Sequence, residues 1–184
     1  MSQQNKYLEI ERRWLLKDLP GLEVLASTRI GVECFELETV YILNDPELEV
    51  RIKRKYSYQN PKITYSVVTK LGAGLTRQES PKLFATSTLF NYYKTVLGKP
   101  YLSKVHRDIV LPSGQKWEIS LYEHPETIYG LVIAEMEFET EEAAKKFSEQ
   151  DFPDWLKPLV VKEVTEDPRY NGKNLAVHGR QNPE

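Results

Sequence analysis

The sequence has one cysteine, Cys34, among 184 residues, and it contains no long apolar run. A single cysteine excludes an intramolecular disulfide and a cysteine-rich zinc site. Uninterrupted apolar stretches such as residues 131–134 are far shorter than the roughly 20 residues that a transmembrane helix needs. Residues 1–6 are polar except for Met1, so we expect no secretory signal, no membrane association and a cytoplasmic location.

A surplus of charge of either sign is also absent. Lys and Arg total 25 against 27 Asp and Glu, which gives a net charge of −2. A generic binder of nucleic acid or of an anionic membrane usually carries a basic surplus, so both classes are disfavoured, although a local basic patch is compatible with this balance. Hydrophobic residues make up 40% of the chain, enough for a packed core. Without repeats, low-complexity tracts or linkers, residues 1–184 are predicted to form a single domain.

Alternation of apolar and polar residues is the dominant pattern, and it predicts β-strands. Turn signals such as Pro112-Ser113-Gly114 separate the alternating segments. Helical periodicity is confined to short segments. The eight predicted strands span residues 7–15, 34–43, 49–56, 62–71, 76–83, 105–111, 115–122 and 129–138, and the predicted helices span residues 17–29, 84–97, 140–149 and 171–177. Short, mostly adjacent strands indicate a mainly β (α+β) protein, an antiparallel barrel or sandwich with a few peripheral helices.

Several predicted strands carry charges of one sign at positions i and i+2, which project from the same face of a strand. Any one such pair is typical of a solvated outer face. Acidic residues occupy the first and last strands, and basic residues occupy the middle strands. The acidic pairs are Glu9 with Glu11 and Glu135 with Glu137, and the basic residues are Arg51, Lys53, Lys70 and Arg77.

This segregation of charge favours an interior site. Like charges inside a closed barrel repel strongly unless a counter-ion lies between them. Clustered carboxylates suit Mg²⁺ or Mn²⁺, whose preferred ligands are oxygen atoms, and clustered Arg and Lys suit a polyanion. A hydrated barrel that carries both sets is expected to bind a metal-bound polyphosphate.

These motifs resemble, in order along the chain, those of the CYTH family, the triphosphate tunnel metalloenzymes. Glu9-Ile10-Glu11-Arg12-Arg13 is similar to the Glu-x-Glu-x-Lys signature that opens the family pattern, and the resemblance extends over residues 7–176. The further matching segments are Arg51-Ile52-Lys53, Val68-Thr69-Lys70, Arg77-Gln78-Glu79, Trp117-Glu118-Ile119-Ser120, Gly130-Leu131-Val132-Ile133-Ala134-Glu135-Met136-Glu137 and Glu163-Val164-Thr165 with Arg169-Tyr170-Asn171.

The resemblance implies an eight-stranded antiparallel closed barrel, a triphosphate tunnel in which carboxylates hold Mg²⁺ or Mn²⁺. It implies that Glu9, Glu11 and Arg13 take part in catalysis. The implied metal ligands are Glu9, Glu11, Glu118, Glu135 and Glu137, and the implied phosphate-binding residues are Arg13, Arg51, Lys53, Lys70, Arg77 and Arg107. On the sixth strand Arg107 is preferred to Lys104, because residues three apart cannot share a strand face without a bulge.

Two departures from the family pattern affect the metal and acid–base side. Arg13 replaces the signature Lys and is a poor proton donor near neutral pH, and Ser120 replaces an Asp that could ligate a metal. His106, His124 and His178 show no mutual metal-ligand spacing, so structural or surface roles are expected for them.

The predicted function is that of a metal-dependent triphosphatase acting on inorganic tripolyphosphate or on an organic triphosphate. A class IV-type adenylate cyclase, or a non-catalytic module that binds polyphosphate or a nucleotide, is the alternative. An apolar-ligand barrel of lipocalin type is disfavoured by the charged rows. The expected partner is a small triphosphate, with nucleic acid limited to an RNA 5′-triphosphate end, and the chain is expected to be a monomer or a homodimer.

Overall fold

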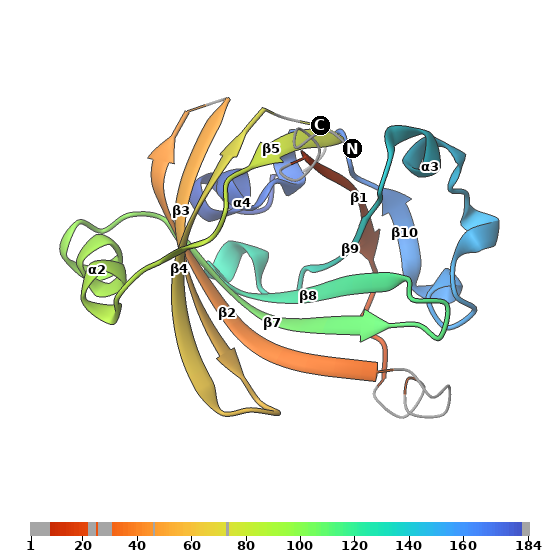
Figure 1. Ribbon diagram of the computed structural model, residues 1–184, viewed down its shortest axis with the longest axis horizontal. Helices are drawn as coiled ribbons and strands as arrows, with labels where there is room; N and C mark the ends of the chain where they lie inside the picture. Colours follow the sequence, from red (N-terminus) through yellow and green to blue (C-terminus); the bar gives the residue numbers. More distant parts are fainter. Residues whose placement is uncertain (1–7, 22–24, 26–30, 46, 73, 182–184) are drawn as a thin grey trace.

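The computed structural model describes residues 8–21, 25, 31–45, 47–72 and 74–181, and these form a closed antiparallel β-barrel (Figure 1). Eight strands follow one another around the barrel in the order β1-β5-β4-β3-β2-β7-β8-β9, and pairing of β9 with β1 closes it. The prediction of an eight-stranded barrel is therefore confirmed, and the sandwich alternative is wrong. The barrel strands are β1 (Leu8–Leu16), β2 (Gly31–Asn44), β3 (Leu48–Ser57), β4 (Lys62–Leu71), β5 (Thr76–Glu79), β7 (Tyr101–Val110), β8 (Lys116–His124) and β9 (Val132–Glu137).

Strand β1 is the seam at which the barrel closes. Its first residues pair with β5, where Glu9 lies opposite Arg77. Its later residues pair with β9, where Glu11 lies opposite Glu137. Successive inward positions on one strand thus face two different neighbouring strands, and this arrangement sets the electrostatics of the interior.

Two short strands lie outside this ring. The strand predicted over residues 76–83 is divided into β5 and β6 (Leu83–Phe84), and both of them pair with β4. Pro81 lies in the break, where it has no N–H to donate to a ladder. Strand β10 (Val160–Glu163), which the alternation did not predict, pairs with the end of β1.

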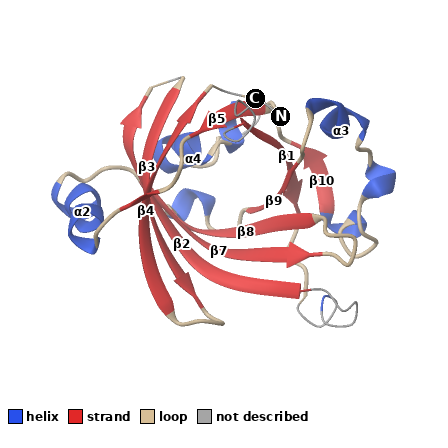
Figure 2. Cartoon of the chain, viewed as in Figure 1, coloured by secondary structure: helices blue, strands red, loops and turns tan. Residues whose placement is uncertain are grey.

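Helices lie around the barrel (Figure 2). The predicted segments 84–97 and 140–149 contain shorter α-helices than expected, the helix predicted over 171–177 is present one residue further along, and most of the helix predicted over 17–29 lies outside the described residues. The α-helices are α2 (Ser87–Asn91), which continues into a π-helical turn (Tyr92–Val96), α3 (Glu141–Lys146) and α4 (Gly172–His178); 3-10 turns span Glu126–Ile128, Glu149–Asp151, Lys157–Leu159 and Pro168–Tyr170. Among the described residues, no helix is both long and apolar enough to span a membrane.

Apolar packing lies mainly between the barrel wall and the segments that cover it. Trp14 and Trp117 pack against Phe152 on one outer side, and Ile52 packs under Phe90 of α2 on another. A third apolar cluster includes Leu102 of β7 and Leu175 of α4. The first two clusters use outward positions of the strands. Leu102 lies on the inward face of β7 and lines the barrel cavity, so the third cluster adds apolar side chains to the interior, while polar and charged side chains occupy many other inward positions.

Candidate functional site

A cavity of about 470 Å³ occupies the barrel interior and is lined by side chains from all eight barrel strands. Its lining is dominated by charge, with Asp or Glu at eight positions and Lys or Arg at nine. The sequence-predicted residues that line it are Glu9, Glu11, Arg13, Arg51, Lys53, Lys70, Arg77, Glu118, Glu135 and Glu137. Arg107 is the one predicted site residue that does not line it.

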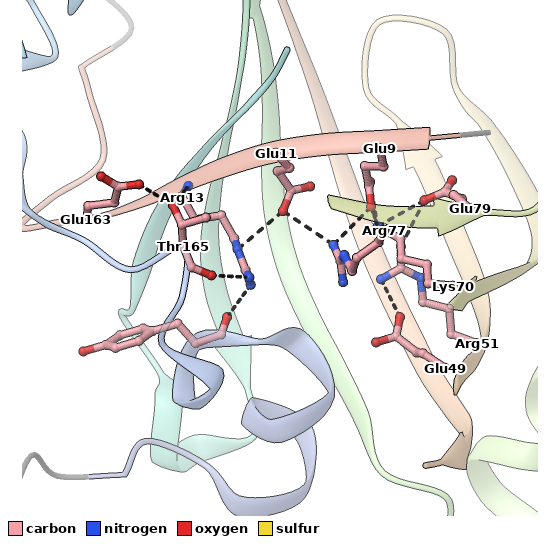
Figure 3. Close-up of polar contacts among 11 residues, drawn as sticks. Glu9, Glu11, Arg13, Glu49, Arg51, Lys70, Arg77, Glu79, Glu163 and Thr165 are labelled. Carbon is pink, nitrogen blue, oxygen red and sulfur yellow. Dashed lines mark hydrogen bonds and ion pairs between the residues drawn. The ribbon is translucent and has the colours of Figure 1, made fainter. Parts of the chain in front are cut away.

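The cationic wall is the part of the lining formed by Arg51, Lys53, Lys70 and Arg77 on β3, β4 and β5. Glu9 of β1 points into this wall (Figure 3). The Lys70 Nζ atom lies 2.6 and 2.5 Å from the two Glu9 carboxylate oxygens, and Arg77 Nη2 lies 3.1 Å from Glu9 Oε2. Burial alone would raise the pKa of Glu9, but Lys70 and Arg77 outweigh burial and hold this pKa at about 2.

Positive charge is crowded at the centre of the cationic wall. Arg51 is 3.0 Å from Glu49 Oε1 and 3.9 Å from Glu79 Oε2, whereas Lys53 forms no ion pair within the described part of the chain. The adjacent Arg51 guanidinium, burial and the Lys70 ammonium together hold the pKa of Lys53 well below its usual value. An anion bound here would relieve the repulsion among these cations.

The carboxylate row is a second part of the lining, formed by Glu11 of β1, Glu135 and Glu137 of β9, and Glu118 of β8. Glu11 lies opposite Glu137, and Glu118 lies opposite Glu135, so the four residues occupy three adjacent strands. Glu135 and Glu137 form no ion pair with any described residue. Burial and the Glu135 carboxylate raise the pKa of Glu11 to about 7, although Arg13 and Arg77 lie 3.4 and 3.6 Å from it.

Glu137 shows the same tendency, because burial and the Glu118 and Glu9 carboxylates raise its pKa. Carboxylates that repel one another in a partly dry cavity are stabilised by a cation among them. Oxygen donors such as those of Glu135 and Glu137 suit a hard divalent ion such as Mg²⁺ or Mn²⁺. The carboxylate row contains four of the five metal ligands that the sequence predicts, whereas the fifth, Glu9, lies in the cationic wall and pairs with Lys70 and Arg77.

A histidine cluster, formed by His106, Asp108, Glu118 and Lys116, adjoins this row on β7 and β8. The His106 Nε2 atom lies 2.9 Å from Asp108 Oδ1 and 3.4 Å from Glu118 Oε2. One ligand atom from each of His106, Asp108 and Glu118 lies within 4.8 Å of the others. Burial would raise the pKa of Glu118, but hydrogen bonds and charge from His106 and Lys116 outweigh it and leave this pKa well below its usual range.

The sequence prediction included Glu118 but missed His106 and Asp108 as members of this cluster. His106 was expected in a surface or structural role, whereas it is 5% exposed and lines the cavity. Spacing among the three histidines gave no signal, because the neighbours of His106 in this cluster are carboxylates and a lysine, not other histidines. The available signal was the i, i+2 alternation of His106 and Asp108, which places both on one strand face.

The prediction for Arg107 was wrong. Its Nη1 atom donates a 2.6 Å hydrogen bond to the Pro20 carbonyl oxygen, whereas Lys104 lines the cavity. Lys104, His106 and Asp108 alternate along β7 and therefore share one face of the strand. Arg107 lies between His106 and Asp108 in the sequence, so its side chain points to the opposite face. The basic residue that β7 contributes to the interior is therefore Lys104.

Arg13 connects the carboxylate row to the chain that follows β10. Its Nη2 and Nη1 atoms donate to the carbonyl oxygens of Thr165 and Tyr170 at 3.1 and 3.3 Å, and its Nε atom lies 3.4 Å from Glu11 Oε1 (Figure 3). Two main-chain bonds fix the guanidinium, so its position beside Glu11 is determined by the fold.

Comparison with known proteins finds a similar curated protein and several solved structures with the same fold. No family model matches the sequence. The chain is 27% identical over 170 residues to an inorganic triphosphatase of Nitrosomonas europaea, covering 92% of this chain and 97% of that protein. The crystal structure of the inorganic triphosphatase NE1496 superimposes with a TM-score of 0.58 at 26% identity, over 96% of this chain and 97% of that one. The structure of PH1819 from Pyrococcus horikoshii shares the fold, with a TM-score of 0.53, 16% identity and coverage of 75% of this chain and 85% of that one.

Proposed function

We propose that this chain is a divalent-metal-dependent triphosphatase of the CYTH, or triphosphate tunnel metalloenzyme, family, with inorganic tripolyphosphate as its substrate. The observation that carries the proposal is the pairing of two complementary surfaces in one cavity. The cationic wall has a crowded, partly uncompensated positive charge, and in the carboxylate row Glu135 and Glu137 form no ion pair within the described part of the chain. A polyphosphate with bound Mg²⁺ or Mn²⁺ would neutralise both at once.

The cationic wall would hold the phosphate chain. Arg51 presents a planar guanidinium suited to two phosphate oxygens, and Lys53 supplies an ammonium without a carboxylate partner in the described chain. Lys70 and Arg77 are already paired with Glu9, so the phosphate would share these cations with that carboxylate. Such fixed donors offset the negative charge that develops on the departing diphosphate.

The carboxylate row would hold the metal and orient the attacking water. Glu11, Glu135 and Glu137, with Glu118 beside them, are the proposed ligands, and Arg13 would keep Glu11 in place from behind. A bound divalent ion would polarise phosphate oxygens and lower the cost of the charge that forms on them. Arg13 itself is assigned to positioning and charge stabilisation, since an arginine does not release its proton near neutral pH.

The proposal for inorganic tripolyphosphate is supported by the full-length similarity to a triphosphatase with that name. Residues 1–184 are proposed to act as one domain, because the strand that closes the barrel, β9, and the first strand, β1, are far apart in the sequence.

The test is phosphate release from tripolyphosphate in the presence of Mg²⁺ or Mn²⁺, with excess EDTA as the control. Arg51→Met should reduce kcat/KM by about 10²- to 10³-fold, the usual effect of removing one preorganised charge-stabilising donor. Arg54→Met is the matched control, because Arg54 lies on the same strand but pairs with Glu38 at 3.3 Å and does not line the cavity. Its kcat/KM should stay within about twofold of the wild type.

Two results would contradict the proposal. Equal kcat/KM for the wild type and Arg51→Met would show that the cationic wall does not contribute to the reaction. Tight binding of tripolyphosphate in calorimetry, with no phosphate release under either metal, would show a binding module and not a hydrolase.

A further inference from the structure

We infer that His106, Asp108 and Glu118 form a second divalent-cation site, one that contains an imidazole nitrogen and lies beside the carboxylate row. This site differs from the row in its donor set, because it combines one nitrogen with carboxylate oxygens. The inference depends on the placement of these side chains and is independent of whether tripolyphosphate is hydrolysed.

The three ligands are placed by two paired strands. His106 and Asp108 alternate on the inward face of β7, and Glu118 of β8 lies directly opposite Asp108 in the ladder. Directly opposite residues of an antiparallel pair have Cβ atoms about 5 Å apart, so their carboxylates can reach one ion. Donor atoms of all three residues already lie within 4.8 Å of one another. Little rearrangement is needed for them to converge on a cation.

Ser120 orients the imidazole ring from behind. It lies opposite His106 in the ladder, is fully buried, and places its Oγ atom 2.9 Å from His106 Nδ1. A ring that donates its Nδ1 proton to this oxygen presents the Nε2 lone pair toward Asp108 and Glu118. Histidines that bind metals through one nitrogen are commonly held in this way through the other.

Two carboxylates that face one imidazole nitrogen are stabilised by a cation between them. In this structure Lys116 supplies positive charge there, since its Nζ atom lies 3.1 Å from Asp108 Oδ2 and 2.5 Å from Glu118 Oε1. The Lys116 side chain is 45% exposed, so it can move into solvent when a cation enters. A bound divalent ion would therefore replace the Lys116 ammonium beside Asp108 and Glu118.

The donor set predicts the class of metal. Mg²⁺ strongly prefers oxygen ligands, whereas Mn²⁺, Co²⁺ and Zn²⁺ also accept imidazole nitrogen. The histidine site is therefore assigned to a transition-metal ion in preference to Mg²⁺. Because Glu118 lies opposite Glu135, this site adjoins the carboxylate row, and the cavity would hold cations at two chemically different positions.

Pulsed electron paramagnetic resonance of the full chain with substoichiometric Mn²⁺ tests the inference directly, since coupling to ¹⁴N reports a nitrogen ligand. The wild type should show this coupling, and His106→Gln should lose it together with at least tenfold in Mn²⁺ affinity. His178→Gln is the matched control, because His178 lies exposed on α4, away from the cavity lining, and it should retain the coupling. In calorimetry, His106→Gln should change Mg²⁺ affinity by less than about twofold.

Absence of nitrogen coupling in the wild type, or its persistence in His106→Gln, would overturn the inference. If His106→Gln proves unfolded by circular dichroism, Asp108→Asn provides the second variant, since it keeps the imidazole and a hydrogen-bonding side chain. It should bind Mn²⁺ at least tenfold more weakly, and unchanged affinity would equally overturn the site. Phosphate release by the wild type in Mg²⁺, measured separately, distinguishes failure of this inference from failure of the proposed function.

Discussion

Glu9 and Glu11 lie two residues apart on the same face of β1, yet the cavity affects them in opposite directions. The pKa of Glu9 is held at about 2, while that of Glu11 is raised to about 7. Both are glutamates on one strand, and both line one cavity. The difference therefore comes from the neighbouring strands and not from the residue type or its local sequence.

Closure of the barrel at β1 is the physical cause. Glu9 pairs across to Arg77 of β5, in the cationic wall, whereas Glu11 pairs across to Glu137 of β9, in the carboxylate row. Glu9 neutralises the cations beside it, whereas the cations near Glu11 do not fully offset its burial and the repulsion from Glu135. The cationic wall is suited to an anion and the carboxylate row to a cation, although a single strand contributes to both.

The largest expected effect is on the stability of the metal-free protein at pH 8. Glu9→Gln should lower the free energy of unfolding by about 3 kcal/mol, because it leaves buried Lys70 and Arg77 without a main counter-charge. Glu11→Gln should act in the opposite direction and raise the melting temperature by a few degrees, because it removes a buried, repelled carboxylate.

Urea denaturation in EDTA measures both variants under one set of conditions. If Glu9→Gln and Glu11→Gln lost a similar amount of stability, the contrast between the cationic wall and the carboxylate row would be contradicted.

The next effect is on the pH dependence of that stability. Glu9 has a folded-state pKa below its usual value of 4.5, so its stabilisation is present above about pH 4.5 and is lost as the pH falls toward 2. Glu11 has a folded-state pKa above 4.5, so its unfavourable contribution is absent below about pH 4.5 and grows as the pH rises to about 7.

Denaturation curves from pH 3 to 8 resolve the two contributions as differences from the wild type. Glu9→Gln should flatten the acid limb alone, and Glu11→Gln should reduce the loss of stability between about pH 4.5 and 7. A Glu11→Gln profile parallel to that of the wild type over this interval would show that Glu11 titrates normally.

The smallest effect tests how far the cationic wall extends onto β7. Lys104→Met should lower kcat/KM for tripolyphosphate by about tenfold, the value of one charged hydrogen bond. Arg107→Met should leave kcat/KM within about twofold, because Arg107 bonds to Pro20 outside the cavity. Steady-state kinetics with both variants measures the two losses of kcat/KM. A larger loss in Arg107→Met than in Lys104→Met would contradict the assignment of Lys104, and not Arg107, to the cavity.

Much of the candidate site follows from strand periodicity. Alternation put Glu9 with Glu11, and Arg51 with Lys53, on shared strand faces, because a strand has only two faces, and the segregation of charge favoured an inward direction for those faces. Arg107 was misplaced because a basic residue was expected on β7, and alternation allowed either Lys104 or Arg107 to face inward without showing which. The lysine three positions earlier shares the inward face with His106 and Asp108.

Alternation along one strand does not predict which residues of the adjacent strands a side chain will contact. Ser120 was interpreted from the sequence as the loss of a metal ligand, but in the barrel it supports His106 from the adjacent strand. Arg13 was expected from the resemblance to take part in catalysis and to bind phosphate, and what the sequence did not predict is that its guanidinium donates to the main-chain carbonyl oxygens of Thr165 and Tyr170.

Alternating strands, and the gathering of charges of each sign on particular strands, can be predicted from the amino-acid order. Which of these charges come into contact depends on how the barrel closes. The reason is that alternation is a local property of the backbone, whereas the charge of a side chain in a closed cavity depends on residues that the strand order and register bring beside it. Glu9 and Glu11 have the same periodicity, and pairing with β5 or with β9 gives them different chemistry.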